Sequence, residues 1–259
     1  MAAGKPHRYP LFRKAMRLLR KVRHYLFTYS QLKRSLRNAW LDLRYGGSFL
    51  GGWAATRFAH LGAHDTGNTD YSILPRLFAN RVKESDVLVD VGCGRGRVIV
   101  WWLSQGYRNK LIGLELDPQI ATDCAHRLRK HQSVRIITGN ALDKIPEEGT
   151  LFYLFDPFAP HVVRKFKEKL EGMFCVRDDI RVVFHMTQSL EAFESDRNWR
   201  VEDVPVPVPP PFRSAVLTLI KQELYDRCKR SLHARKPLWA ALHRASPQSR
   251  TSTQPDPSV

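Results

Sequence analysis

The segment from Asp86 to Arg97 constrains the fold of this chain more than any other. It reads Asp-Val-Leu-Val-Asp-Val-Gly-Cys-Gly-Arg-Gly-Arg, and an apolar run, Val98–Leu103, follows at once. The β-branched stretch Val87–Val91 predicts a buried strand. Three alternating glycines follow it, and glycine lets a backbone turn tightly while leaving room for a ligand. Free N–H groups at the start of the next helix would point toward that ligand. This combination of strand, turn and helix predicts a site for a nucleotide-type cofactor.

Two features distinguish this turn from an ordinary strand-to-helix turn, which is the alternative. Asp90 lies within the end of the strand, where a carboxylate is costly unless it has a partner. Gly92, Gly94 and Gly96 form G-x-G-x-G rather than the G-x-G-x-x-G of dinucleotide enzymes. The pattern resembles motif I of the class I S-adenosylmethionine-dependent methyltransferases. The resemblance implies that this turn, with Cys93, wraps the methionine part of S-adenosylmethionine, and that Asp90 helps to hold its amino group.

An acidic residue ends the second predicted strand, within residues 110–118. Glu115 follows the glycine turn by roughly 20 positions, where nucleotide-binding α/β folds place a carboxylate for the ribose hydroxyls. A carboxylate there disfavours a 2′-phosphate, so an ordinary ribose is expected. We therefore expect Glu115 and its neighbour Leu116 to contact the cofactor. Asp117 is expected to cap the next helix, over residues 119–131.

The third predicted strand, Val134–Thr138, leads into Gly139, Asn140 and Ala141. The family resemblance implies that Asn140, with Ala141 beside it, meets the adenine amino group of the cofactor. The family usually has an aspartate here, but an amide oxygen can accept the same hydrogen bond. The alternative is that Asn140 only caps a turn or helix.

A fourth apolar strand, within residues 151–158, delivers Asp156, Pro157 and Phe158 to the carboxyl edge of the sheet, where open α/β sheets bind ligands. The triplet is similar to motif IV of amine-methylating members of the family, although it has one proline where the family has two. The resemblance implies that Asp156 contacts both the cofactor and an acceptor amine, with Phe158 stacking on the acceptor. Such a site acts mainly by positioning. A structural Asp-Pro turn is the alternative.

The segment before the first strand is expected to fold over the cofactor, as the resemblance implies. Residues 45–70 are glycine-rich and predict irregular structure. Asp70 and Tyr71 are therefore candidates for covering the site, and Tyr71 is expected to contact the cofactor. Alternatively, Asp70 or Ser72 caps a helix over residues 73–82.

Seven strands are expected in all. A fifth lies over residues 180–185, and an antiparallel pair over residues 199–208 and 214–221 closes the sheet. His161 and His185 lie near the same sheet edge and are weaker site candidates. The predicted fold is α/β: a Rossmann-like three-layer sandwich around a mostly parallel seven-stranded sheet with an antiparallel last strand, carrying basic helical N- and C-terminal extensions.

The net charge of +17 belongs mainly to the two ends of the chain. Residues 1–45 contain twelve Lys or Arg and one acid, a charge of +11, and residues 221–259 carry +5. The centre is therefore almost neutral. We expect a basic amphipathic extension over residues 1–45, a methyltransferase domain over 46–221, and a basic helix with a disordered tail over 222–259.

The basic amphipathic pattern over residues 11–27 leaves three partners open. The helix could dock on the domain, lie on an anionic membrane surface, or contact nucleic-acid phosphates. No apolar run reaches the length of about 18–20 residues that spans a bilayer, and no secretory signal is visible. The four cysteines are scattered, which favours a reducing compartment without a metal site. We expect a cytoplasmic protein, with peripheral membrane association as a further possibility.

The sequence thus favours S-adenosylmethionine-dependent N-methylation of an amine, such as a protein lysine. Two alternatives stay open: methylation of an RNA or DNA base, and a catalytically inactive module that binds the cofactor and a partner. The sequence identifies neither the methyl acceptor nor the oligomeric state. A P-loop NTPase is excluded, since no G-x-x-x-x-G-K-[ST] occurs.

Overall fold

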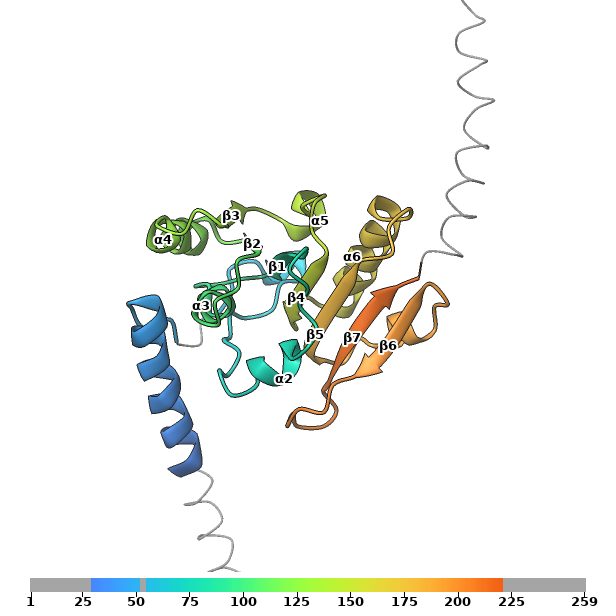
Figure 1. Ribbon diagram of the computed structural model, residues 1–259. Helices are drawn as coiled ribbons and strands as arrows, with labels where there is room; N and C mark the ends of the chain where they lie inside the picture. Colours follow the sequence, from blue (N-terminus) through green and yellow to red (C-terminus); the bar gives the residue numbers. More distant parts are fainter. Residues whose placement is uncertain (1–28, 52–54, 221–259) are drawn as a thin grey trace, which may run out of the picture.

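The computed structural model describes residues 29–51 and 55–220. A seven-stranded sheet with the order β3-β2-β1-β4-β5-β7-β6 forms the centre of this part (Figure 1). Strand β7 runs antiparallel to both of its neighbours, and the other pairings are parallel. The predicted fold class is therefore confirmed. The strands are β1 (Val87–Val91), β2 (Lys110–Glu115), β3 (Val134–Thr138), β4 (Leu151–Phe155), β5 (Arg181–Thr187), β6 (Trp199–Asp203) and β7 (Arg213–Leu219).

Helices cover both faces of this sheet and make the outer two layers. Side chains of α2, α3 and α4 pack in one core cluster, and those of α5, α6 and α7 pack in the other. Successive residues of a strand point to opposite faces, so Leu88 enters the first cluster and Val89 the second. The helices are η1 (Ala59–Leu61), α2 (Leu74–Phe78), α3 (Arg97–Ser104), α4 (Pro118–Leu128), α5 (Ala141–Lys144), α6 (Pro160–Met173) and α7 (Glu191–Glu194).

Several elements are shorter than their sequence patterns predict, and local backbone chemistry explains where they end. Strand β4 stops at Phe155 because Asp156 has a positive φ of 39° and Pro157 lacks an N–H. Helix α2 ends before Asn80, whose φ is 57°. Strand β6 stops at Asp203, two residues before the first of two prolines that cannot donate to a ladder.

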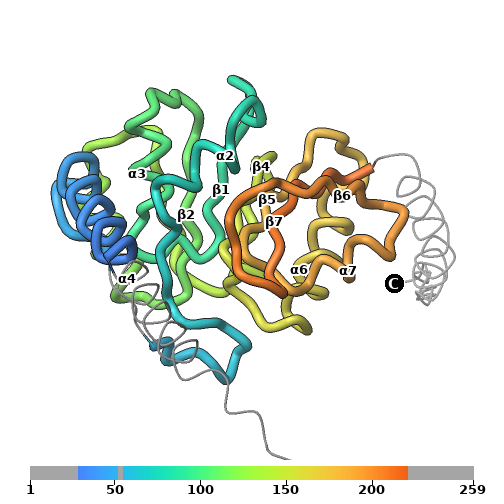
Figure 2. The backbone as a smooth tube through the Cα atoms, turned by 90° about the horizontal axis from the view of Figure 1, so that it is seen from below, coloured from blue at the N-terminus to red at the C-terminus, as the bar shows by residue number. Residues whose placement is uncertain are grey.

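Residues 29–46 form a further helix beside α3, at the end of the described part of the chain (Figures 1 and 2). Asp42 on this helix is fully buried, and its carboxylate accepts hydrogen bonds from Arg97 Nε at 2.9 Å and Nη2 at 2.6 Å. It also accepts from the hydroxyl of Tyr71 at 3.0 Å and the backbone N–H of Leu50 at 3.2 Å. This cluster fixes the last turns of the helix to the first turn of α3.

The predicted helix over residues 11–27, and the basic helix and tail predicted over residues 222–259, lie outside the described residues. The proposed boundary at residue 45 therefore stays a prediction, although the contacts of Asp42 show that the end of the N-terminal extension already packs on the central domain. Within residues 29–51 and 55–220, no helix combines the length and the apolar character that crossing a bilayer requires.

The buried ion pair gives the first testable prediction. Asp42→Ala leaves the Arg97 guanidinium buried without its carboxylate, which should lower the free energy of unfolding by about 3–5 kcal/mol in a urea titration. The matched control is Glu148→Ala, which removes solvent-exposed pairs with Lys110 and Arg135 and should cost only about 0–1 kcal/mol. Equal costs for the two variants would show that the buried pair does not secure the helix.

Candidate active site

The glycine turn after β1 closes against the end of β2. The N–H groups of Gly92 and Cys93 both donate to the carbonyl oxygen of Leu114, at 2.9 Å. The N–H of Gly94 donates to Glu115 Oε2 at 2.8 Å. Gly94 has a φ of +52°, and a Cβ there would lie 3.3 Å from the side chain of Thr66. The turn therefore needs glycine for its backbone conformation and for the segment that passes over it.

Gly96, at the start of α3, is a second position that requires glycine. Its φ is +76°, and it occupies the position that precedes the first helical residue. A Cβ at Gly96 would lie 2.8 Å from the sulfur of Cys124 on α4, so the two helices could not pack as closely around a larger residue.

Glu115 ends β2 with both carboxylate oxygens engaged by backbone N–H groups. Its second oxygen, Oε1, accepts from the N–H of Asp117 at 2.9 Å. Burial raises the pKa of Glu115, and the backbone N–H donors oppose that shift. Asp117 in turn caps α4 by accepting from the N–H groups of Gln119 and Ile120, with Pro118 at the first helical position, so the predicted cap is confirmed.

Asp90 is the second-to-last residue of β1 and has an unsatisfied carboxylate oxygen. Its side chain is buried, and Oδ2 has no hydrogen-bond partner within the described residues. Burial raises the pKa of Asp90 well above its ordinary value, and the nearby Cys124 and Glu115 raise it further. A buried carboxylate of this kind gains most from a cationic donor, which would supply both a charge and hydrogen bonds.

Residues 55–67 cover the glycine turn. Ala63 forms an isolated antiparallel bridge with Phe158. The N–H of His64 donates to the carbonyl of Pro157 at 3.0 Å, and the N–H of Ala159 donates to the carbonyl of Gly62 at 2.8 Å. The irregular segment is thus attached by its backbone to the residues that follow β4.

This placement corrects the expectation that Asp70 and Tyr71 cover the site. Tyr71 is buried because its hydroxyl bonds to Asp42 and its ring lies under the guanidinium of Arg97, 5.3 Å from ring centre to Cζ. Asp70 accepts from the N–H and the hydroxyl of Ser72, which shapes the turn before α2. The covering residues lie several positions earlier in the chain.

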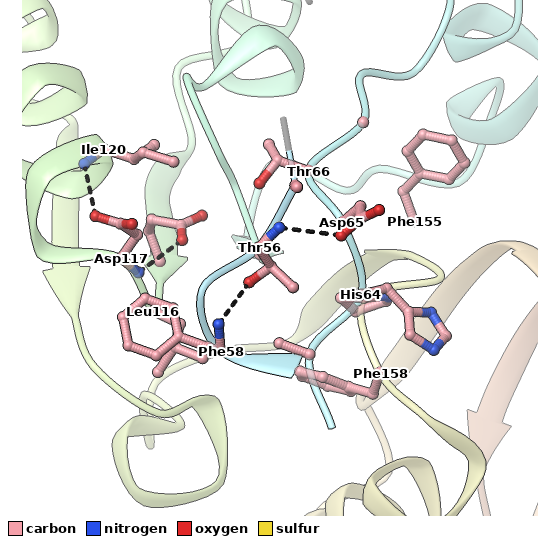
Figure 3. A pocket seen from close by; sticks show the side chains of 16 residues that line it. Thr56, Phe58, His64, Asp65, Thr66, Leu116, Asp117, Ile120, Phe155 and Phe158 are labelled. Atoms are coloured by element: carbon pink, nitrogen blue, oxygen red, sulfur yellow. Dashed lines mark hydrogen bonds between the residues drawn. The ribbon is translucent and has the colours of Figure 1, made fainter. Parts of the chain in front are cut away.

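Two adjoining cavities lie under the covering segment. The first, the β2-side cavity, has a volume of about 100 Å³ and is shown in Figure 3, with Leu116, Asp117 and Ile120 on one side and the covering segment on the other. The second, the β5-side cavity, measures about 420 Å³ and reaches Met186 and Phe212. The two cavities adjoin each other, and six residues line both: Thr56, Ala63, His64, Asp65, Gly67 and Phe155.

Only some of the predicted site residues line these two cavities, and Asp90, Cys93, Gly94 and Gly96 line neither. Gly92, Glu115 and Leu116 line the β2-side cavity together with Pro157 and Phe158, and Asp156 lines the β5-side cavity. The structure therefore brings the ends of β1, β2 and β4 together at one sheet edge, as predicted from the sequence.

Asp156 has a partner that sequence reasoning did not identify. His64 Nδ1 lies 2.8 Å from the backbone oxygen of Asp156 and 3.3 Å from its Oδ2. Burial raises the pKa of Asp156, while the neighbouring imidazole of His64 opposes the rise. The two residues are 92 positions apart, and no local pattern links them.

Asn140 and Ala141 line neither cavity. The side-chain oxygen of Asn140 accepts from the N–H of Leu142 at 2.9 Å and caps the short helix α5, so the capping alternative is confirmed. Contact between Asn140 and adenine stays a prediction.

The two weaker histidine candidates also lie outside both cavities. His185 is buried, with Nδ1 2.8 Å from Ser214 Oγ and its ring 5.1 Å from that of Phe155. Burial lowers the pKa of His185 to about 4, so the ring is neutral at pH 7 and serves packing. His161 is exposed on the first turn of α6.

Comparison with known proteins decides what kind of domain this geometry belongs to. Residues 89–152, which run from β1 to β4, match the family model described as a methyltransferase domain. This match identifies the core of a methyltransferase domain within the chain. The matched residues contain the glycine turn, Asp90 and Glu115, and they end just before Asp156.

Solved structures with a similar arrangement include other methyltransferases. An RNA methyltransferase from Salinibacter ruber, in complex with S-adenosyl-L-homocysteine, shares 19% identity over 60% of this chain and 95% of its own, with a TM-score of 0.48. A TehB-like SAM-dependent methyltransferase from Corynebacterium glutamicum shares 20% identity over 62% of this chain and 92% of its own, with a TM-score of 0.43. No curated protein matches the chain.

The methyltransferase domain uses S-adenosylmethionine, and the residues at the sheet edge fit that cofactor. The unpaired carboxylate oxygen of Asp90 suits the cationic amino group of the methionine part. Glu115 offers a carboxylate beside the β2-side cavity where a ribose can be held, and the glycine turn leaves space for close backbone approach. When bound, the cofactor supplies an electrophilic methyl group; the protein supplies binding and alignment.

Asp90→Asn should weaken cofactor binding but stabilise the ligand-free protein. It should weaken binding of S-adenosylhomocysteine about tenfold or more in a calorimetric titration, because a charged hydrogen bond becomes neutral. A carboxylate with a raised pKa destabilises the native state as the pH rises above about 3.9, its unfolded value. The ligand-free variant should therefore melt at a higher temperature than the wild type at pH 7, with a smaller gain near pH 4.

The exposed carboxylate of Asp143 provides the matched control, and Asp143→Asn should change neither quantity. Wild-type affinity in Asp90→Asn would refute the assignment of Asp90 to the cofactor.

Proposed function

We propose that this methyltransferase domain transfers the methyl group to an amine nitrogen, in a protein lysine or a comparable amine. The chemistry of the β5-side cavity carries the proposal. Its described lining residues include two acids, Asp65 and Asp156, and no Lys or Arg, while Phe155, Met186 and Phe212 supply apolar surface. A lysine side chain combines an apolar stem with a cationic end, and this lining is complementary to both.

In the proposed site, the residues of the glycine turn hold the methionine part of the cofactor with Asp90. Glu115 and Leu116 hold the ribose, and Asn140 and Ala141 contact the adenine. The lining of the β2-side cavity supports the roles of Glu115 and Leu116. Asn140 would have to accept a hydrogen bond from the adenine amino group with the same side-chain oxygen that caps α5.

Asp156, Pro157 and Phe158 form the acceptor side of the proposed site. The carboxylate of Asp156 would accept an N–H from the acceptor amine and orient the nitrogen lone pair toward the cofactor. The acceptor ammonium would first lose a proton to water, because only the neutral amine has a lone pair. The neutral nitrogen would then take the electrophilic methyl group that the cofactor supplies when bound, and the thioether of S-adenosylhomocysteine would be left. Asp156 and the aromatic rings beside it act by alignment and by excluding bulk water, rather than by acid–base catalysis.

His64 would serve as a positioning residue in this scheme. Its ring contacts both the carbonyl and the carboxylate of Asp156, a residue with a left-handed backbone conformation that few non-glycine residues adopt. The contact supports the carboxylate in one orientation at the junction of the two cavities.

Methylation of a nucleic-acid base is the second candidate, and the same cavities argue against it. Among the described residues that line them there is no Lys or Arg to contact a phosphate, and the acids would repel one. A catalytically inactive module would bind the cofactor but transfer no methyl group.

The decisive test offers labelled S-adenosylmethionine with lysine peptides, small amines and RNA as acceptors. We expect transfer to an amine. Asp156→Ala should lower kcat/KM about 100-fold, the scale of a misplaced acceptor, and leave S-adenosylhomocysteine affinity unchanged. Asp143→Asn, which alters an exposed acid that lines neither cavity, is the control and should retain full activity.

The outcomes separate the three functions. Transfer to RNA but to no amine would identify a nucleic-acid enzyme. Cofactor binding without transfer to any acceptor would identify an inactive module. Full activity of Asp156→Ala would remove Asp156 from the acceptor site.

The pH dependence of methyl transfer is a separate prediction. Asp156 must be ionised to accept an N–H, and its pKa is raised by burial. Activity should therefore fall as the pH drops through a value above about 3.9, the ordinary pKa of aspartate. In Asp156→Asn, which cannot ionise, this acid limb should be absent from the pH profile of kcat/KM. If the acid limb of the pH profile were unchanged in Asp156→Asn, the titrating group would be a residue other than Asp156.

A further inference from the structure

The helix over residues 29–46 exposes an apolar stripe that points away from the domain. Residues three or four apart lie on the same side of a helix, and five large apolar residues follow that spacing here. We call them the outer stripe: Tyr29, 66% exposed; Leu32, 57%; Leu36, 62%; Trp40, 57%; and Leu43, 56%. Together they give this helix a continuous apolar surface open to solvent.

The opposite side of the same helix is the one that docks. Leu41 and Asp42 are buried, and Asn38 lies 3.4 Å from the N–H of Tyr71 through its side-chain oxygen. Arg34 adds an ion pair to Asp70 at 3.4 Å, also toward the domain. A surface helix of a globular protein normally turns its apolar side to the core. Here a polar cluster docks and the outer stripe is left outside.

Basic residues border the outer stripe. At about 100° per residue, Lys33, Arg37 and Arg44 fall together along one edge of it, and all three are exposed. The guanidinium of Arg44 lies over the Trp40 ring, with Cζ 5.3 Å from the ring centre. The only acid among residues 29–46 is Asp42, which is buried on the far side. The exposed surface therefore combines apolar side chains with positive charge alone.

We propose that the outer stripe inserts into the interface of an anionic membrane, with the helix lying parallel to the bilayer. An apolar face bordered by Lys and Arg and containing an aromatic residue is the composition that binds such surfaces. The 18 helical residues span about 27 Å, enough for several side chains to enter the headgroup boundary together. This inference is independent of the identity of the methyl acceptor.

Other occupants fit this surface less well. Nucleic-acid phosphates would use the basic edge but leave five large apolar side chains in water. A second copy packed stripe against stripe would bring two basic edges together with no exposed acid on either helix to pair with them. Charge complementarity therefore favours an anionic lipid surface.

The test is flotation of the full-length chain with vesicles of phosphatidylcholine alone or of phosphatidylcholine mixed with phosphatidylglycerol. We expect binding to the anionic vesicles, weakened by added NaCl. The double substitution Leu36→Asp and Trp40→Ser should reduce the partition coefficient at least about tenfold, because less apolar surface is buried. Arg37→Glu alone should reduce it about fivefold or more.

Matched controls separate the outer stripe from the rest of the surface. Val176→Asp removes another exposed apolar side chain, 59% exposed, and Arg200→Glu removes another exposed charge. Both should bind vesicles as the wild type does. All variants should bind S-adenosylhomocysteine unchanged, which shows that the domain is folded.

Three results would overturn the proposal. The first is vesicle binding that the stripe substitutions leave intact, because another part of the chain would then be responsible. The second is a dimer, seen by light scattering, that Trp40→Ser dissociates. The third is RNA binding that depends on the stripe in the absence of any affinity for anionic vesicles.

Discussion

The carboxylate of Glu115 joins the parts on which the site depends. It accepts one hydrogen bond from the turn after β1, at Gly94, and one from the start of α4, at Asp117. These bonds are possible because β1 and β2 are parallel neighbours in register, so that Val91 lies beside Leu114 and the following residues meet at one edge. Without the carboxylate, the turn would keep its bonds from Gly92 and Cys93 to Leu114 but lose the one at Gly94.

Much of this arrangement could be predicted because its determinants are local. The apolar run of β1 and the G-x-G-x-G turn lie within a dozen consecutive residues, and β1 and β3 have the predicted bounds. Asp117 caps α4 through N–H groups two and three positions ahead, which depends only on residue type and spacing. Parallel strands then bring Glu115 and Asp156 to one edge without further information.

The remaining features depend on contacts that no local pattern encodes. The segment that covers the site lacks periodicity, and His64 reaches Asp156 only when the fold is complete. Tyr71 precedes β1 as the resemblance required, yet a hydrogen bond to Asp42, 29 positions earlier, holds it away from the cavities. For the helix over residues 29–46, hydrophobicity alone would turn the apolar side inward; the buried ion pair with Arg97 determines the opposite orientation.

The attachment of the covering segment to the end of β4 has a kinetic consequence. The β2-side cavity, at about 100 Å³, is smaller than the roughly 300–1,000 Å³ of typical ligand pockets, and from this we infer that the segment lifts when the cofactor enters. Lifting breaks the backbone bonds to Pro157 and Ala159 and so takes the acceptor side apart. Catalysis would then follow a compulsory order, cofactor first. An acceptor that arrived early would hold the segment down and form a dead-end complex, seen as inhibition at high acceptor concentration.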